Sequence, residues 1–306
     1  MIVTTDEIFR TNSRNLLSLN REASLSYSTP GKVTGIVVRL GTSLDKELLS
    51  SFENLKFVAT ITTGLDHIDL KYCESKNIKV ISLKDEGAFL NTITATPEHT
   101  WGLLLSLMRK VPAANDSVKK HNWDRDSFFG NELASSKLGI IGLGRVGKIV
   151  AEYARAFRMQ ICFYDPYVKD EFPDCEKVSL EELLKTSDVI TIHAPLNAST
   201  VHLINKDHFS LMLKCPYFVN TSRGKIVKEE DLLWALESKK IKGAALDVLE
   251  HELRFKNKII ESPLIDYINS HDNLLITPHI AGSTFESMKK TALFIESKIL
   301  ETFPGC

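Results

Sequence analysis

Short apolar runs recur along this 306-residue sequence, and most are separated by stretches with helical spacing or helix-capping residues. Such runs are typical of strands in a parallel sheet, which are covered on both faces and therefore lack polar alternation. The predicted strands are residues 2–4, 33–40, 55–62, 79–83, 138–141, 161–164, 189–193, 217–220, 244–246 and 274–277. Strands that alternate with helices in this way predict the α/β fold class, with parallel sheets.

Helix starts are marked by short polar side chains that can cap free backbone N–H groups. Ser179 opens a capping box, and Thr96 precedes a proline, which suits the first helical position. The predicted N-caps are Ser43, Asp69, Thr96, Ser179 and either Ser283 or Thr284. Helices are also predicted over residues 206–213 and 229–238, whereas residues 84–96 read as a polar, irregular stretch.

The helix that follows Thr96 is apolar around most of its circumference, with Trp101, Met108 and several leucines in it. A helix that is hydrophobic on most sides must be buried. Its position between two α/β segments suits a connector between domains. A core helix of either domain is the alternative that the sequence leaves open.

The strongest single motif is Gly142-Leu-Gly144-Arg-Val-Gly147, which lies between a predicted strand and a predicted helix over residues 146–158. Gly142 suits a tight turn, Gly144 lets the backbone approach a pyrophosphate, and Gly147 lets the helix pack closely on the strand. The N-terminus of that helix offers N–H groups and a partial positive charge to phosphates. Asp165 ends the next strand, where its carboxylate can bind an adenosine ribose and would repel a 2′-phosphate. This context predicts a dinucleotide site rather than a plain βαβ turn, and NAD rather than NADP.

The composition is that of an ordinary soluble globular protein, with 43% hydrophobic and 25% charged residues. The length suits about two domains. A net charge of −1 gives no electrostatic reason to expect a nucleic acid or a membrane surface as partner. No apolar run reaches membrane-spanning length, and the N-terminus lacks the pattern of a signal peptide. Five scattered cysteines without a CxxC pair favour a reducing cytoplasm over a disulfide framework or a zinc site, so no metal is predicted.

Polar residues at the carboxyl ends of the predicted strands are the candidates for a site, because doubly wound sheets bind ligands at that edge. Taken singly, each has a structural alternative. Arg223 could form a surface ion pair, Glu252 could be a solvated loop charge, and His279 could be a structural imidazole. The full set is Asp165, Thr221, Ser222, Arg223, Asp247, Glu252 and His279.

Taken together, the candidates suit one kind of chemistry. An NAD site implies hydride transfer, and hydride transfer to a carbonyl needs a proton donor at the carbonyl oxygen. Histidine is the side chain best suited to that task near neutral pH. A neighbouring carboxylate would favour the protonated imidazole and fix its tautomer, and an arginine fork would hold a substrate carboxylate.

The sequence resembles the D-isomer-specific 2-hydroxyacid dehydrogenases, most of all the phosphoglycerate dehydrogenase branch. The resemblance rests on segments that follow one another in the family's order from about residue 35 to the end. They are Thr63-Gly-Leu-Asp-His-Ile-Asp69, Glu98-His-Thr-Trp-Gly-Leu103, residues 138–147, His193-Ala-Pro-Leu196, Thr221-Ser-Arg-Gly224, Gly243-Ala-Ala-Leu-Asp-Val248 and Thr277-Pro-His-Ile-Ala-Gly282.

The resemblance implies roles for particular residues. Arg223, Glu252 and His279 would be catalytic, and Asp247 would hold the nicotinamide carboxamide. The substrate would be bound by Thr63, Gly64, Leu65 and Arg223, with the Gly64 and Leu65 amides on its carboxylate. NAD would be bound by Gly142, Gly144, Arg145, Val146, Gly147, Asp165, Ala194, Pro195, Thr200, Thr221, Ser222, Arg223, Asp247 and His279.

The resemblance also implies an architecture of two doubly wound parallel-sheet domains. A Rossmann NAD-binding domain, residues 97–276, would be inserted into a flavodoxin-like substrate-binding domain formed by residues 1–96 and 277–306. A hinge would lie near the Thr96 helix and its C-terminal counterpart. Relatives are commonly dimers, so a homodimer is expected.

Departures from the family bear on the substrate. Many relatives have Asn where His67 stands and proline where Leu253 stands. The phosphoglycerate enzymes place a basic residue just before the Gly64 loop, and this sequence has none there, with Arg39 the nearest candidate. We therefore expect a small unphosphorylated 2-oxo acid, such as hydroxypyruvate or glyoxylate.

The stretch 84–96 is longer than in the phosphoglycerate enzymes, and its Phe89 and Leu90 could admit a bulkier substrate side chain. D-3-phosphoglycerate dehydrogenase of serine biosynthesis is the alternative activity. A non-enzymatic NAD(H) sensor or partner-binding protein on the same fold is the alternative class. Because all three catalytic positions are intact, the sequence favours an NAD-dependent D-2-hydroxyacid dehydrogenase.

Overall fold

The computed structural model describes residues 1–13, 15–16, 25, 30–169, 171–252, 255 and 262–305. The chain divides into two compact units, called here the terminal unit (residues 1–93 and 283–306) and the central unit (residues 94–282). The boundaries predicted at residues 96 and 277 lie a few residues from these limits. Leu253 lies outside the described residues.

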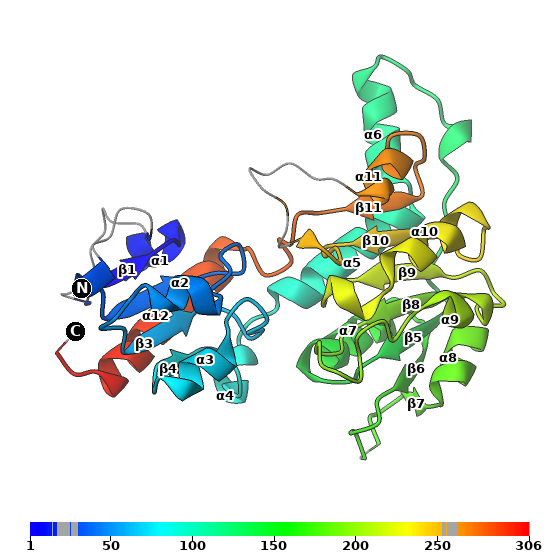
Figure 1. Cartoon of the computed structure of the whole chain (residues 1–306). Helices are drawn as coiled ribbons and strands as arrows, with labels where there is room; N and C mark the ends of the chain where they lie inside the picture. The colour runs from blue at the N-terminus through cyan, green and yellow to red at the C-terminus, as the bar shows by residue number, and fades with distance from the viewer. Residues whose placement is uncertain are drawn as a thin grey trace. The chain divides into compact units, whose positions relative to one another are not determined.

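The terminal unit is built on a parallel sheet whose described strands run in the order β1-β2-β3-β4. They are β1 (Ile2–Thr4), β2 (Gly35–Val38), β3 (Phe57–Thr60) and β4 (Lys79–Ile81). All four were predicted from their apolar runs and are confirmed, three of them with shorter bounds. The helices of the unit are α1 (Glu7–Asn12), α2 (Lys46–Ser50), α3 (Leu70–Ser75), α4 (Gly87–Leu90) and α12 (Phe285–Thr302) (Figure 1).

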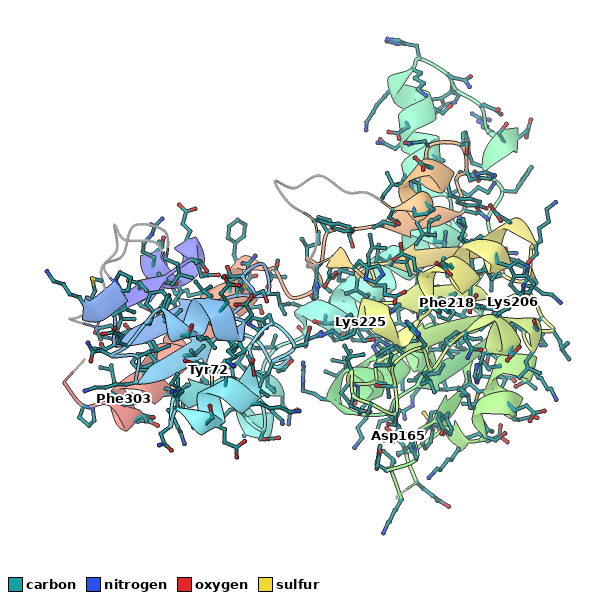
Figure 2. All side chains as sticks on the ribbon, viewed as in Figure 1. Tyr72, Asp165, Lys206, Phe218, Lys225 and Phe303 are labelled. Carbon is teal, nitrogen blue, oxygen red and sulfur yellow. The ribbon has the colours of Figure 1, made fainter. Side chains whose placement is uncertain are left out.

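The C-terminal helix α12 belongs to the terminal unit because its apolar residues complete that unit's core. Ala292, Ile295 and Ile299 are fully buried in one cluster with residues of β1 to β4. Phe303, labelled in Figure 2, stacks on Phe57 of β3 with ring centroids 4.9 Å apart. The two ends of the chain thus fold together, as the discontinuous layout anticipates.

The central unit is built on a parallel sheet with the order β11-β10-β9-β8-β5-β6-β7. Its strands are β5 (Lys137–Ile141), β6 (Gln160–Tyr164), β7 (Glu176–Lys177), β8 (Val189–Ile192), β9 (Tyr217–Asn220), β10 (Gly243–Leu246) and β11 (Leu274–Ile276). The first strand, β5, lies between β6 and β8, so the strand order reverses there. This is the Rossmann arrangement, and the reversal marks the edge where such sheets bind ligands.

Helices cover both faces of this sheet (Figure 1). One face carries a core with Trp101 and Leu104 of α5 and Val150 of α7, and the other carries a core with Leu183 of α8 and Leu236 of α10. The helices are α5 (Ala95–Met108), α6 (Val111–Lys119), α7 (Arg145–Ala156), α8 (Leu180–Thr186), α9 (Lys206–Ser210), α10 (Glu229–Glu237) and α11 (Pro263–Ile268). Because both faces are covered, the strands read as continuous apolar runs, and the α/β prediction is confirmed.

The α5 helix packs against β9, β10, β11 and α7, so it is a core helix of the central unit that starts at the unit boundary. Its N-cap is Thr94 and not Thr96, so the predicted start was wrong by two residues. Pro97 falls at the third helical position. A proline is tolerated there because the first-turn N–H groups have no partner within the helix.

Other predicted boundaries also need correction. The N-cap of α2 is Asp45, not Ser43, because Leu44 is still extended and pairs with Ile68. Residues 84–96 are not wholly irregular, since they contain α4. By contrast, the caps predicted at Asp69 and Ser179 are confirmed, and Thr284 is the cap of α12.

Besides α4, the helices α1, α6 and α11 were not predicted. The α6 helix follows Lys110, which adopts a left-handed conformation, and no residue of α6 is buried. It projects away from the sheet of its unit, together with the segment that follows it (Figure 1). Over the part of the chain that the structure describes, no helix is long and apolar enough to cross a membrane.

Candidate active site

The glycine motif forms a tight turn between β5 and α7. Gly142 has a φ of +93°, which side-chain-bearing residues rarely adopt, and a Cβ on it would lie 2.8 Å from the His193 carbonyl. A Cβ on Gly147 would lie 2.3 Å from the Gly142 carbonyl oxygen, so the helix could not approach the turn with any larger residue. Gly144 is the N-cap of α7, and a Cβ there would meet nothing within 4 Å. The turn therefore leaves open space at the helix N-terminus, as pyrophosphate binding requires.

Asp165 follows β6 and faces this turn (Figure 2 labels it). Its Oδ2 accepts a hydrogen bond from the Leu143 N–H at 2.9 Å, and its Oδ1 accepts one from the Tyr167 N–H at 2.9 Å. Oδ1 also accepts from the Val168 N–H at 3.3 Å, so three of the roughly four acceptor positions of the carboxylate are used and one remains for a ribose hydroxyl. The open space at Gly144 and the acid at Asp165 fit NAD.

The loop after β8 borders the same turn. His193 Nε2 lies 2.9 Å from Thr191 Oγ1, and burial lowers the pKa of His193 to about 3, so its imidazole is neutral at physiological pH. Thr200 donates to the Pro195 carbonyl at 2.7 Å and accepts from the Asn197 N–H at 2.8 Å. Thr200 therefore shapes the loop that presents Ala194 and Pro195.

The turn after β9 presents Arg223 and is organised by Asn220. The Asn220 Oδ1 accepts from the Ser222 N–H and hydroxyl at 3.0 and 2.8 Å, and its amide donates to the Arg223 carbonyl at 3.0 Å. Thr221 is buried, with its hydroxyl 2.8 Å from the hydroxyl of Thr100 on α5.

The backbone after Arg223 lies directly against the loop that follows β10. A Cβ on Gly224 would lie 2.1 Å from the Leu249 carbonyl carbon and 2.5 Å from the Glu250 nitrogen. Only glycine allows this approach, so the Arg223 turn and the Glu252 loop are packed side by side.

Glu252 and His279 form a direct pair. Glu252 Oε1 lies 2.6 Å from His279 Nδ1, and Glu252 Oε2 accepts from the Leu249 N–H at 3.2 Å. The side chains of Glu252 and His279 keep 23% and 21% of their surface exposed, so the pair is accessible to a ligand. Because Glu252 holds Nδ1, the Nε2 of His279 is the nitrogen left for a substrate.

Asp247 lies beneath the His279 turn and is fully buried. Its carboxylate accepts from the N–H groups of Ile280 and Ala281 at 2.9 and 2.7 Å and from the Thr277 hydroxyl at 2.5 Å. Its backbone carbonyl accepts from the His279 N–H at 2.8 Å. These bonds hold His279 at a φ of +53°, a left-handed conformation that histidine rarely adopts.

The charge of Asp247 is stabilised by these donors. Burial raises the pKa of its carboxyl, but hydrogen bonds from His99, Thr277 and the two backbone N–H groups outweigh burial, so the net pKa is lowered. His99 Nε2 lies 3.0 Å from Thr277 Oγ1 and 3.5 Å from Asp247 Oδ1. Asp247 was predicted only as a ligand of the nicotinamide carboxamide. Its contacts in the structure are with the turn that carries His279.

The parts played by His99 and Thr277 were not predicted from the sequence. Both lie in segments that carried the family resemblance, but neither was singled out. Their contact joins α5 to the end of β11, positions 178 residues apart. The one signal in the sequence was the position of His99 near the start of a helix predicted to be buried. A polar side chain at such a position is expected to face inward and to need a hydrogen-bond partner.

The predicted substrate residues Thr63, Gly64 and Leu65 lie in the terminal unit, after β3. Arg39 follows β2 in the same sheet. Its Nε lies 3.4 Å from a carboxylate oxygen of Asp6, which is almost fully buried and caps α1. Arg39 also donates to Met288 Sδ at 3.5 Å. Its charge is therefore already compensated within the unit.

Phe89 and Leu90 do not form a loose loop. Phe89 of α4 stacks on Phe294 of α12 with ring centroids 3.9 Å apart, and Leu90 packs against the same core cluster. Glu86, just before α4, pairs with Lys298 at 2.6 Å. The segment 84–92 is thus fastened to α12.

These features define a class of protein. A Rossmann sheet with a fitted glycine turn, an acid after the second strand and a carboxylate–imidazole pair at the same edge is the arrangement of a nicotinamide-dependent dehydrogenase.

Comparisons with known proteins agree. Residues 101–281 match the family model "D-isomer specific 2-hydroxyacid dehydrogenase, NAD binding domain". The chain is 36% identical over 275 residues to D-3-phosphoglycerate dehydrogenase of Bacillus subtilis, covering 88% of this chain and 49% of that protein. It is 34% identical over 276 residues to a putative 2-hydroxyacid dehydrogenase of Staphylococcus epidermidis, covering 88% and 83%. The D-lactate dehydrogenase of Aquifex aeolicus, solved with NAD and lactic acid, has a TM-score of 0.84 and 33% identity over 99% of this chain and 95% of that chain.

The chain therefore belongs to the D-isomer-specific 2-hydroxyacid dehydrogenase family, and the resemblance drawn from the sequence is confirmed. The central unit is its NAD-binding domain. The chain spans about half the length of the phosphoglycerate dehydrogenases that it matches.

Proposed function

We propose that this protein is an NAD-dependent oxidoreductase that interconverts a small D-2-hydroxy acid and its 2-oxo acid. The observation that carries the proposal is the Glu252–His279 pair, with 2.6 Å between Oε1 and Nδ1 at the ligand-binding edge of an NAD-binding sheet. When bound, the cofactor supplies or accepts the hydride at the substrate carbon.

His279 is the proton donor to the substrate oxygen in reduction and the proton acceptor in oxidation. Its Nε2 faces the substrate because Glu252 holds Nδ1. Glu252 fixes the tautomer and stabilises the imidazolium. Arg223 holds the substrate carboxylate with its planar guanidinium.

NAD is held by the glycine turn of residues 142–147 and by Asp165, with further contacts from the loops after β8 and β9. Asp165 excludes NADPH because its carboxylate would lie beside the 2′-phosphate, and like charges repel. Ala194, Pro195 and Thr200 belong to the loop after β8, beside the glycine turn, and Thr221 and Ser222 belong to the loop after β9.

The substrate is a small unphosphorylated 2-oxo acid of the hydroxypyruvate or glyoxylate type. A phosphate needs uncompensated positive charge, and Arg39 already pairs with the buried carboxylate of Asp6. No lysine or arginine stands in the sequence from Thr60 to Asp69. Phe89 and Leu90 pack against the core of their unit. Because they are held there, we expect no room to open for a bulky substrate side chain.

D-3-phosphoglycerate dehydrogenase activity is the second candidate, favoured by the names of the relatives matched over half their length. Oxidation of NADH by the purified protein should be followed over a range of concentrations of hydroxypyruvate, glyoxylate, pyruvate and 3-phosphohydroxypyruvate. A higher kcat/KM for hydroxypyruvate than for its 3-phosphate is expected. A preference for the phosphate that disappears in Arg39→Ala would establish the second candidate instead. NADH binding without turnover of any 2-oxo acid would favour a sensor.

The protein acts as a homodimer that pairs through α6 and the segment after it. This arm, residues 111–129, projects from the central unit and exposes Trp123 and Phe129 to 75% and 77% of their surface. Large exposed apolar side chains on a projecting arm suit a covered interface. Light scattering should give twice the chain mass, and Trp123→Lys with Phe129→Lys should halve it, whereas lysine at the exposed Leu213 should not.

The cellular setting is a reducing cytoplasm. Cys73, Cys162, Cys175 and Cys215 form no disulfide in the described residues, and two of them are buried. Secreted domains of this size seldom retain several unpaired thiols.

A further inference from the structure

A chain of hydrogen bonds runs from a buried histidine to the loop that carries Gly64. His67 Nε2 lies 3.3 Å from Thr60 Oγ1, Thr60 Oγ1 lies 2.9 Å from Thr62 Oγ1, and Thr62 Oγ1 donates to the Gly64 carbonyl at 2.8 Å. His67 and Thr60 keep 1% and 0% of their surface exposed. All four residues belong to the terminal unit.

The donor and the acceptor of each of these hydrogen bonds can be assigned, because each hydroxyl has only one proton to donate. The Thr62 hydroxyl proton is used on the Gly64 carbonyl, so Thr62 must accept from Thr60. The Thr60 proton is then used as well, so the Thr60 oxygen must accept from His67. A hydroxyl has one donor and two acceptor positions, and each position in the chain is consistent with that inventory. His67 Nε2 therefore carries a proton.

The bond to the Gly64 carbonyl also sets the direction of the next N–H. Peptide bonds are planar and trans, and the described residues contain no cis peptide. The carbonyl of Gly64 and the N–H of Leu65 belong to one peptide and point in opposite directions. Since the carbonyl turns inward to Thr62, the Leu65 N–H points out of the loop. It donates to no group among the residues that the structure describes.

We infer that Thr62, held by Thr60 and His67, is the positioning residue for the substrate carboxylate. By fixing the Gly64–Leu65 peptide, it turns the Leu65 N–H out of the loop, where the carboxylate of a substrate can accept from it. The inference rests on the proposed dehydrogenase function for the identity of the ligand.

Four substitutions test the chain. Thr62→Val removes the hydroxyl and keeps the shape, while Thr62→Ser keeps the hydroxyl. His67→Leu removes the donor, while His67→Asn keeps one. Thr302→Val is the matched control, since the Thr302 hydroxyl donates to the Lys298 carbonyl on the exposed face of α12.

The KM for the preferred 2-oxo acid, kcat and the NADH dissociation constant are measured for each variant. Thr62→Val and His67→Leu should raise KM about tenfold, the effect of one misdirected hydrogen bond to a charged group. Thr62→Ser and His67→Asn should restore KM to within about threefold of the unmodified value. NADH binding should be unchanged in all variants, because these hydrogen bonds lie in the terminal unit whereas the NAD-binding domain is the central unit. An unchanged KM in Thr62→Val, or a loss that serine does not rescue, would overturn the inference.

Failure of the proposed function gives a different pattern. If no 2-oxo acid is turned over, binding of oxamate in the presence of NADH is measured by calorimetry. Oxamate carries the carboxylate without being reduced. Weaker oxamate binding by Thr62→Val, restored in Thr62→Ser, would uphold the positioning role while the dehydrogenase proposal fails. Absence of oxamate binding by the unmodified protein would overturn the positioning role as well.

Discussion

Replacement of Asp247 by asparagine tests whether the left-handed conformation of His279 depends on the buried carboxylate beneath it. Each carboxylate oxygen accepts from a backbone N–H, one from Ile280 and one from Ala281. Asparagine has the same shape but only one oxygen. In either orientation its amide nitrogen would face a backbone N–H, so one donor must lose its partner.

Two magnitudes follow from this geometry. A buried donor left without its charged partner costs about 1–3 kcal/mol of unfolding free energy. The left-handed conformation of His279 costs a further ~1–2 kcal/mol, which the Asp247 bonds offset in the native protein. If the turn relaxes by that amount, the population with His279 in place falls about 5- to 30-fold, and kcat should fall with it.

Tryptophan fluorescence during urea unfolding reports the stability of the central unit, because all three tryptophans, Trp101, Trp123 and Trp234, lie in it. Steady-state kinetics and NADH titration give kcat and cofactor affinity. Asp272→Asn is the control, since Asp272 forms an exposed ion pair with Lys110 in the same unit. It should change neither stability nor kcat appreciably.

The pH dependence supplies a second test. The folded-state pKa of Asp247 is lowered, so its carboxylate stabilises the fold above the unfolded pKa of about 3.9 and loses that effect as pH falls through the folded value. The stability difference between the two proteins should be constant from about pH 5 to 8 and shrink below about pH 4. An asparagine variant with unchanged kcat and stability, or one that loses only NADH affinity, would refute the positioning role and leave Asp247 as a cofactor ligand.

Three further predictions concern the proposed site. Asp165→Ser should relax the preference for NADH, measured as the ratio of kcat/KM for NADH and NADPH, and better turnover of NADPH by the unmodified protein would contradict the role of the acid. His279→Ala should lower the rate of reduction roughly 10²- to 10⁴-fold, and Glu252→Gln should lower it less, with NADH affinity retained in both. Because burial lowers the pKa of His193 to about 3, the unfolded state binds its proton first as pH falls below about 6.5. The central unit should therefore lose about 2–3 kcal/mol by pH 4.5, and His193→Gln should lose less in the same urea assay.

Most of the sheet and the glycine turn could be predicted because their causes are local. A buried parallel strand must be apolar along its length, and the turn after β5 must have glycine where a Cβ would strike His193 or the Gly142 carbonyl. Helix starts were less secure. Ser43 and Asp45 are both good caps, and the choice between them depends on the pairing of Leu44 with Ile68, which no local pattern reveals.

Helices without a buried face were missed for a related reason. The α6 helix has no buried residue, so its sequence lacks the periodic apolar stripe that marks a packed helix. The network around Asp247 was missed because it is nonlocal. His99, Thr277 and Asp247 come from three elements, and each has an ordinary alternative role when considered alone.

The strand order explains how residues far apart in the sequence meet at one edge. Arg223, Glu252 and His279 follow β9, β10 and β11, which are neighbours in a parallel sheet, so their loops leave from the same side. The polar residue after a strand can then hydrogen-bond to the turn that follows a neighbouring strand. Asp165 after β6 accepts from Leu143 in the turn after β5, and Asp247 after β10 accepts from the turn after β11.

Asp165 and Asp247 are therefore each placed to act on the loop of a neighbouring strand. In a sheet of this kind, a strand-ending carboxylate can serve as a ligand group and as a clamp on the adjacent turn, because parallel neighbours end about 4.8 Å apart. Substitution of either acid should disturb a loop that the acid does not belong to. Separating the two roles requires affinity and turnover to be measured together, since loss of a ligand group weakens NADH binding whereas loss of a clamp lowers kcat.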